Sequence, residues 1–405
     1  MNIYPLTPEQ RYFYDCQNSA PESVMCSYFP YLGRLKDCVN MERFADCVMK
    51  TLHVHPAHLT VIEEHGGIPC QRYVPDLITG IPIERISEAE LMTLKDDLIQ
   101  PFHWGEAMCR FRLFITEKGK YFFFDDHNII CDGFGKILFW QDIQRVYDGQ
   151  DLEPDSWFAY LQEREASKSS PHYEESRKWY EENYGTHDFC GYPHADYDSG
   201  GRNGQGVLRV SSGLNDDSFG VLKQWHLTRT EFFLAVSLLA TAEYNLNPSV
   251  LITWCSKGRW KKEYRRSTGM MTQDMPAFLN VDGLTPEEIA SSVREQVKGC
   301  MLHHDYPYMS LDERMLADDN LCFLYQGRLY TDGPVIPLSA GMADMKNKYS
   351  AAENILDVEA IETDLGIDLL FDYNAGRYKR ESIERFAGLY IRILHDALRR
   401  INTYA

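Results

Sequence analysis

The sequence lacks the cysteine spacing of a metal-binding or disulfide-bonded protein. Its 405 residues include 11 cysteines, an odd number, and no two of them form a CxxC pair. This excludes a zinc-finger arrangement and a paired disulfide framework. We therefore expect free thiols in a reducing compartment.

Long apolar runs and an excess of positive charge are also absent. The longest apolar stretch, residues 232–242, is too short to cross a bilayer, and the N-terminus does not resemble a signal peptide. Lys and Arg number 41 against 60 Asp and Glu, a net charge of −19. Such an acidic body repels phosphate backbones and anionic membranes. We expect a cytoplasmic protein that binds neither nucleic acid nor membrane.

What is present is an ordinary globular composition, with 44 % hydrophobic residues, in a chain long enough for two or three domains. Gly, Asp, His and Asn are concentrated at residues 186–206, which indicates a loop or linker. Elements of similar type lie on both sides of it. We therefore expect two lobes of one fold class, residues 1–180 and 181–405.

Hydrophobic spacing and end signals predict a coarse order of elements. Predicted helices cover residues 40–52, 134–147, 155–166, 172–184, 216–225, 230–244 and 381–399, and two more open at 7–10 and 285–288. Predicted strands cover residues 60–63, 70–74, 109–116, 121–125, 206–211, 250–255, 321–326 and 365–373. The apolar run at 121–125 indicates a strand that is buried on both faces.

The segment Asp126-His127-Asn128-Ile129-Ile130-Cys131-Asp132-Gly133 follows this strand and holds the candidate chemistry. An amine or hydroxyl that attacks an acyl carbonyl must lose a proton, and an imidazole with a near-neutral pKa can accept it. We expect His127 to be the catalytic residue. Asp132 is expected to hold the loop, by an ion pair or by capping the next helix, and Gly133 to leave room beside backbone N–H groups. Alternatively, Asp132 is only an N-cap and Gly133 only a turn residue.

The same segment resembles the HHxxxDG signature of condensation domains of nonribosomal peptide synthetases, with Asp126 taken as the first His and His127 as the second. The resemblance extends over nearly the whole chain. Other segments that resemble family motifs lie at residues 4–11, 55–60, 100–114, 267–276, 304–308 and 370–374.

The resemblance implies an α/β fold with two chloramphenicol-acetyltransferase-like lobes, arranged as a V-shaped pseudo-dimer around a central tunnel. His127 would face the tunnel and either accept the proton of the amine or orient the amine. Acidic carrier proteins would deliver a carrier-bound acyl or aminoacyl thioester on a phosphopantetheine arm, and the domain itself would bind no cofactor. The acceptor would be a small-molecule or carrier-bound amine, or an alcohol, and the product an amide or ester.

Two departures from the family motifs carry their own expectations. A carboxylate at Asp126, beside His127, would raise the pKa of the imidazole. Leu59 stands where the motif at residues 55–60 has Arg, so Asp132 needs another cation, which Arg259 or Arg112 would supply.

Further candidate contacts lie outside the loop. Arg259 belongs to the most basic run, residues 257–266, which is either a solvated loop or a docking patch for an acidic carrier protein. Gln326 and His304 are the other candidate carrier or tunnel contacts. Metal binding is not expected, since the His pairs lack partners at ligand spacing. Cys131 lies in an apolar triplet and is read as a buried thiol rather than a nucleophile.

Two other functions stay open. One is a related acyltransferase that uses a soluble amine or alcohol, or a coenzyme A donor. The other is a catalytically degenerate domain that recruits carrier or tailoring proteins, which the unusual Asp126 and Leu59 favour.

Overall fold

A computed structural model of the chain describes residues 3–19, 30–185, 189–197, 204–311, 320–328 and 355–403. These residues form two compact units. Unit 1 contains the described residues up to Ser167 together with Lys257–Thr272, and unit 2 contains the others. Among the described helices, none has the length and apolarity that a bilayer crossing needs.

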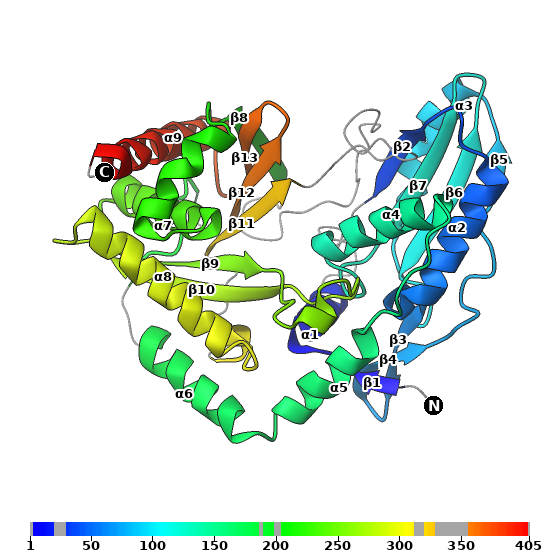
Figure 1. Ribbon diagram of the computed structural model, residues 1–405, viewed down its shortest axis with the longest axis horizontal. Coiled ribbons are helices and arrows are strands. Elements are labelled where there is room, and N and C mark those ends of the chain that lie inside the picture. Colours follow the sequence, from blue (N-terminus) through cyan, green and yellow to red (C-terminus); the bar gives the residue numbers. More distant parts are fainter. Residues whose placement is uncertain are drawn as a thin grey trace. The chain divides into compact units, whose positions relative to one another are not determined.

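Unit 1 is built on a four-stranded sheet and a smaller three-stranded sheet (Figure 1). The larger sheet has the order β2-β7-β6-β5, formed by Tyr31–Leu35, Lys120–Asp126, Cys109–Ile115 and Ile83–Arg85. The smaller sheet has the order β1-β4-β3, formed by Ile3–Pro5, Ile68–Tyr73 and Thr60–His65. Its helices are α1 (Pro8–Ser19), α2 (Met41–Val54), α3 (Glu88–Leu94), α4 (Gly133–Tyr147) and α5 (Trp157–Ser167). Short 3-10 turns occur at η2 (Pro56–Leu59), η3 (Lys95–Leu98) and η5 (Lys262–Tyr264).

Strand β7 is buried on both faces, as the apolar run predicts. Phe122 and Phe124 lie in the main core with rings from α2 and α4, and Phe124 lies 5.8 Å from the ring of Phe139. Phe123 belongs to a second cluster, with Phe114 and with Leu91 of α3. The strand is thereby fixed from both sides, and so is the start of the loop that follows it.

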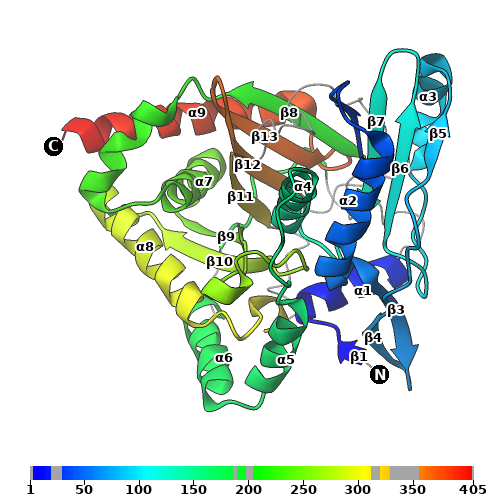
Figure 2. The same ribbon diagram turned by 45° about the vertical axis from the view of Figure 1, so that its right-hand side comes forward.

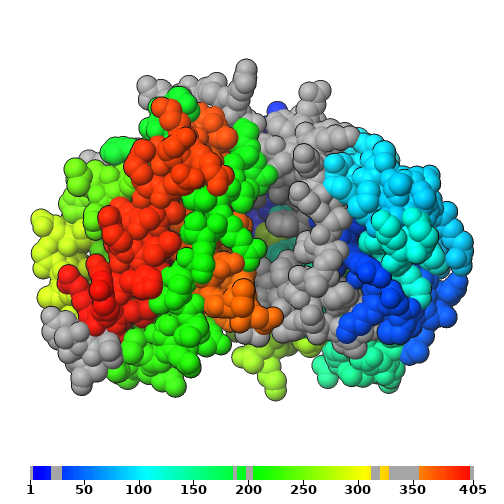
Figure 3. Space-filling model, turned by 90° about the horizontal axis from the view of Figure 1, so that it is seen from above, coloured from blue at the N-terminus to red at the C-terminus, as the bar shows by residue number. Residues whose placement is uncertain are grey.

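Unit 2 is a six-stranded sheet that carries helices. The strand order is β10-β9-β11-β12-β13-β8, formed by Gln273–Asn280, Ser249–Ser256, Leu321–Arg328, Leu356–Thr363, Gly366–Asn374 and Gln205–Ser211. The helices are α6 (Pro171–Tyr184), α7 (Arg229–Asn245), α8 (Pro286–Leu302) and α9 (Arg380–Thr403), with 3-10 turns η4 (Asp216–Trp225) and η6 (Tyr308–Ser310). Helix α7 packs on α8, α9 and the central strands (Figure 2). The red helix α9 runs along the surface of unit 2 beside the green segment that includes η4 (Figure 3).

The division between the units differs from the sequence-based boundary at residues 180/181. Helix α6 belongs to unit 2, because its side chains pack there. The Ser176 hydroxyl lies 3.0 Å from His303 Nδ1, and the Trp179 ring stacks on the same imidazole at 4.6 Å. Residues 257–272 in turn belong to unit 1, a return of the chain that no composition signal marks.

Candidate functional site

The loop of residues 127–132 connects the end of β7 to the first turn of α4. Asp132 is the N-cap of α4, and its Oδ1 accepts a hydrogen bond of 2.6 Å from the backbone N–H of Gly135. The backbone N–H of His127 donates to the carbonyl of Met108 at 2.9 Å, which continues the strand by one residue. The sequence-based expectation that Asp132 caps this helix is confirmed.

Asp132 also holds the segment that returns from residues 257–272. Its two carboxylate oxygens lie 2.9 and 3.0 Å from Nη1 and Nη2 of Arg259. Its Oδ2 accepts further bonds from the backbone N–H groups of Met271 at 2.9 Å and Thr272 at 3.0 Å. One buried carboxylate therefore ties together β7, α4 and a segment more than 120 residues further along the chain.

Arg259 is the cation that pairs with Asp132, in place of the Arg that the motif has at Leu59. Arg112, the other candidate, pairs with Glu84. The side chain of Arg259 is only 4 % exposed. It also donates to the carbonyls of Ser267 and Gly269. A guanidinium held inside unit 1 leaves almost no surface for a carrier protein, which argues against the docking reading of Arg259, while its contact with a tunnel stays a prediction.

His127 is fully buried, with both ring nitrogens engaged. The backbone N–H of Ile129 donates to Nδ1 at 2.9 Å, so Nδ1 carries no proton. Nε2 then carries the proton and donates to Oε1 of Gln17 at 2.9 Å. The side-chain N–H of Gln17 donates to the carbonyl of Phe102 at 3.0 Å, which fixes the amide with its oxygen toward His127. Two independent contacts thus select the same tautomer.

Burial lowers the pKa of His127 to about 3. Burial is the cause of this shift, and the carboxylate of Asp126 forms an ion pair with Lys136 of α4 instead. The expectation that Asp126 raises the pKa of His127 is therefore wrong. Burial also raises the pKa of Asp126, although Lys136 opposes this. His127 is a neutral hydrogen-bonding group inside the loop.

The spacing of the signature also shows that His127 does not occupy the second-His position. HHxxxDG has three residues between its second His and its Asp, whereas four residues separate His127 from Asp132. Counted back from Asp132, the second-His position is Asn128 and the first is His127, so Asp126 lies before the signature. Asn128 is half-buried, and its Oδ1 has no hydrogen-bond partner among the described residues. Asn128, rather than His127, is the polar side chain of the loop with an uncommitted acceptor.

Helix α1 positions this loop through two glutamines that sequence reasoning did not identify. Gln10 and Gln17 are seven residues apart, so they lie on one face of the helix. Gln10 Nε2 donates to the carbonyl of Ile129 at 2.7 Å, and Gln17 contacts His127. Both side chains are buried, at 0 and 8 % exposure. Two polar residues at this spacing on the apolar face of a helix were the signal that could have found them.

Gly133 and Cys131 flank Asp132 and differ in environment. Gly133 is exposed, and a Cβ placed on it would meet no atom within 4 Å. That open space agrees with the expectation of room at this position, although its use by a substrate stays a prediction. Cys131 is fully buried, and burial raises the pKa of its thiol well above the ordinary value. Burial therefore argues against Cys131 as a free thiolate nucleophile.

The two remaining candidate contacts lie in unit 2. Gln326 of β11 donates from Nε2 to Oε2 of Glu359 at 3.0 Å. The carbonyl of His304 accepts from Nε2 of Gln273 at 3.1 Å. Contact of either residue with a carrier protein or a tunnel stays a prediction.

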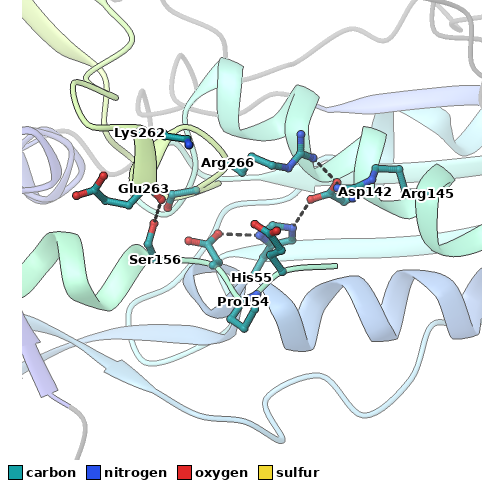
Figure 4. A pocket seen from close by; sticks show the side chains of 11 residues that line it. His55, Asp142, Arg145, Pro154, Ser156, Lys262, Glu263 and Arg266 are labelled. Carbon is teal, nitrogen blue, oxygen red and sulfur yellow. Dashed lines mark hydrogen bonds and ion pairs between the residues drawn. The ribbon is translucent and has the colours of Figure 1, made fainter. Parts of the chain in front are cut away.

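A second polar cluster in unit 1 surrounds His55, beside a pocket of about 320 Å³ (Figure 4). The imidazole lies between two carboxylates, with Nδ1 2.7 Å from Asp155 and Nε2 3.0 Å from Asp142. Both nitrogens face acceptors, so the ring is an imidazolium. Burial opposes this charge, but the hydrogen bonds to the carboxylates outweigh it and raise the pKa of His55. Arg266 pairs with Asp142, so this cluster too holds the returning segment.

Similarity to solved structures defines the class. The chain superimposes on the condensation domain of the monacolin K polyketide synthase MokA with a TM-score of 0.82, covering 98 % of each chain at 13 % identity. It superimposes on the X-domain that was solved in complex with OxyB from teicoplanin biosynthesis with a TM-score of 0.78, at 14 % identity, covering 98 % of this chain and 94 % of that one. The fold is therefore that of a condensation domain, with two mixed α/β lobes of the chloramphenicol-acetyltransferase type.

The family follows from the sequence match. The Condensation domain family matches residues 1–403, and the chain belongs to it. Surfactin synthase subunit 2 of Bacillus subtilis is 22 % identical over 412 residues, which cover 97 % of this chain and 11 % of that protein. The chain thus corresponds to about one ninth of this relative. Condensation domains of nonribosomal peptide synthetases are acyltransferases that form amide bonds.

Proposed function

We propose that this chain joins a carrier-bound acyl or aminoacyl thioester to an amine, by direct transfer and without a covalent acyl-enzyme. The observation that carries the proposal is the way in which Asp132 fixes the loop. Asp132, Arg259 and the backbone of residues 127–133 form one fixed structure in a chain that matches the family throughout. Such a fixed loop suits catalysis by positioning.

In this reaction the amine nitrogen attacks the thioester carbonyl, a C–N bond forms and the C–S bond breaks. The proton of the amine ends on the departing sulfur, so no base is consumed overall. His127 has a pKa of about 3 and carries a proton on Nε2, so it supports the loop rather than taking that proton. The Oδ1 atom of Asn128 can accept an N–H of the amine and aim its lone pair at the carbonyl. Catalysis then rests on orientation, which accounts for a large part of many enzymatic rate enhancements.

The proposal includes the partners. Acidic carrier proteins bring the acyl group on a phosphopantetheine arm, in the cytoplasm, and the acceptor is a small amine or a second carrier-bound amine. Contacts of Gln326 and His304 with a carrier protein or with a substrate tunnel also belong to this proposal. The nearest alternative within the same chemistry is a related acyltransferase that uses a soluble amine or alcohol as acceptor, or a coenzyme A thioester as donor.

The test is reconstitution with loaded carrier proteins and a panel of amines, followed by intact-mass spectrometry. Matched reactions with acyl-coenzyme A separate the two donor classes. We expect wild type to form amide from the carrier-bound donor, Asn128→Ala to lose at least about tenfold in rate, and Asn128→His to retain activity. Unchanged turnover in Asn128→Ala would refute the positioning role. His127→Ala is the comparison variant, which shows the loss of activity to expect when the support of the loop is removed.

One observation favours a second function, recruitment without catalysis. Asn128 stands where the signature has its second His, and the chain resembles an X-domain that was solved as a complex with OxyB. A recruiting domain would bind carrier or tailoring proteins while producing no amide. Stable binding of a loaded carrier, without product from any donor and amine in the panel, would select this function.

A further inference from the structure

A buried cluster of potential metal ligands lies directly behind the signature loop. Asp126 ends β7, Cys131 precedes Asp132, and His58 comes from the turn η2. A ring nitrogen of His58, a carboxylate oxygen of Asp126 and the Sγ of Cys131 lie within 4.8 Å of one another. All three residues are 0 % exposed.

His58 is the group that this cluster leaves unexplained. Neither of its ring nitrogens has a hydrogen-bond partner among the described residues. The ring stacks on Phe139 at 4.4 Å, inside the aromatic core of unit 1. A buried polar group without a partner is unfavourable, and such groups in proteins commonly mark an ion or a water. Here the imidazole faces a carboxylate and a thiol, which are both ligand types.

We infer that His58, Asp126 and Cys131 form a binding site for a divalent metal ion of the zinc type. Zinc binds imidazole nitrogen, carboxylate oxygen and thiolate sulfur at about 2.0–2.3 Å, usually in tetrahedral geometry. A carboxylate and a thiolate balance two positive charges, and the proton of the thiol is released when the metal binds. The fourth position is left for a water molecule. The site is independent of the proposed acyl transfer.

Lys136 is the competitor for this site. Its ammonium pairs with Asp126 and supplies the local positive charge in the metal-free chain. The metal and the ammonium therefore exchange places at Asp126. Removing the ammonium should strengthen metal binding.

The position of the site gives the ion a structural role. Asp126 and Cys131 bracket residues 127–130, so one ion bound to both would close the base of the signature loop. His58 would connect that loop to the turn between α2 and β3. An ion in this place holds the loop without contacting a substrate.

The experiment uses the full chain, without an affinity tag, and Co²⁺ as a spectroscopic probe. Thiolate ligation to Co²⁺ gives a near-ultraviolet charge-transfer band, and a tetrahedral site gives visible d–d bands. We expect one equivalent of Co²⁺ to bind, Zn²⁺ to displace it, and Cys131→Ser to abolish the charge-transfer band. Lys136→Met should bind Co²⁺ at least about tenfold more tightly, since it removes a competing positive charge.

The matched control is a second group in the same unit, Glu63, His65 and Cys70 on the β3–β4 hairpin. There Glu63 already binds Arg72 through both oxygens. Cys70→Ser should therefore leave the Co²⁺ spectrum unchanged. Loss of the band in Cys70→Ser but not in Cys131→Ser overturns the assignment, and so does the absence of any stoichiometric band in wild type and Lys136→Met. Thermal unfolding monitored by circular dichroism verifies that each variant is folded.

Discussion

The protonation state of His127 can be tested by changing its partner on α1. In Gln17→Glu a carboxylate replaces an amide oxygen that lies 2.9 Å from Nε2. A unit charge at about 4 Å, with an effective dielectric constant of about 20, interacts by about 4 kcal/mol. This corresponds to about three pKa units. The pKa of His127 should therefore rise from about 3 to about 6.

The measurement is a pH titration by ¹⁵N NMR of protein labelled at histidine, with the His127 signals assigned by their loss in His127→Gln. In wild type, His127 should show the Nε2–H tautomer and no titration between pH 5 and 8, because its pKa is about 3. Gln17→Met is the control, since it removes the acceptor without adding charge and should leave the pKa low. A wild-type His127 that titrates near 6.5, the ordinary value, would refute the reasoning and restore the general-base role.

Three further predictions concern the stability of unit 1. Asp132→Ala should lower the free energy of unfolding by about 3–5 kcal/mol in urea titrations, because it leaves Arg259 buried and unpaired. The double variant Asp132→Ala/Arg259→Met should lose less free energy of unfolding than the sum of the losses in the two single variants. Gly135→Ala should destabilise the protein by about 1–3 kcal/mol, because the added Cβ would lie 2.3 Å from a backbone carbonyl oxygen. Gly133→Ala should change stability by less than about 0.5 kcal/mol. Equal effects of the two substitutions would contradict the close packing at Gly135. The pKa of His55 is raised in the folded state, so its contribution to stability is complete below pH 6.5 and disappears as the pH rises through the folded-state pKa. The denaturation midpoint of wild type should fall as the pH rises through that value, and the midpoint of His55→Asn should not.

The elements that the sequence predicts are those with strong local signals. The Phe-rich strand, the helix predicted at 134–147 and the closing helix α9 have apolar patterns that match their periods, and the structure confirms them. The predicted helix at 216–225 is a 3-10 turn. Strands β1, β2, β5, β10 and β12 were missed. β10 contains Pro276, which argues against a strand, yet it lies at the edge of the sheet, where a missing N–H is tolerated.

The site was only partly predictable, for a different reason. The cap at Asp132 is local, so its sequence sufficed. The hydrogen bonds of His127 come from α1, and the cation for Asp132 comes from 127 residues away. The spacing of hydrophobic residues along the chain does not predict such long-range contacts. His127 occupies the first position of the signature and Asn128 the second, because three residues separate Asn128 from Asp132.

The long separation between Asp132 and Arg259 has a consequence for the growing chain on the ribosome. The carboxylate is made 127 residues before the guanidinium that neutralises it inside unit 1. At synthesis rates of about 5–20 residues per second, the delay is on the order of ten seconds. During that time the strands and helices of the first 167 residues can form, but Asp132 has neither Arg259 nor the backbone of Met271 and Thr272. Unit 1 therefore matures only after part of unit 2 has been synthesised.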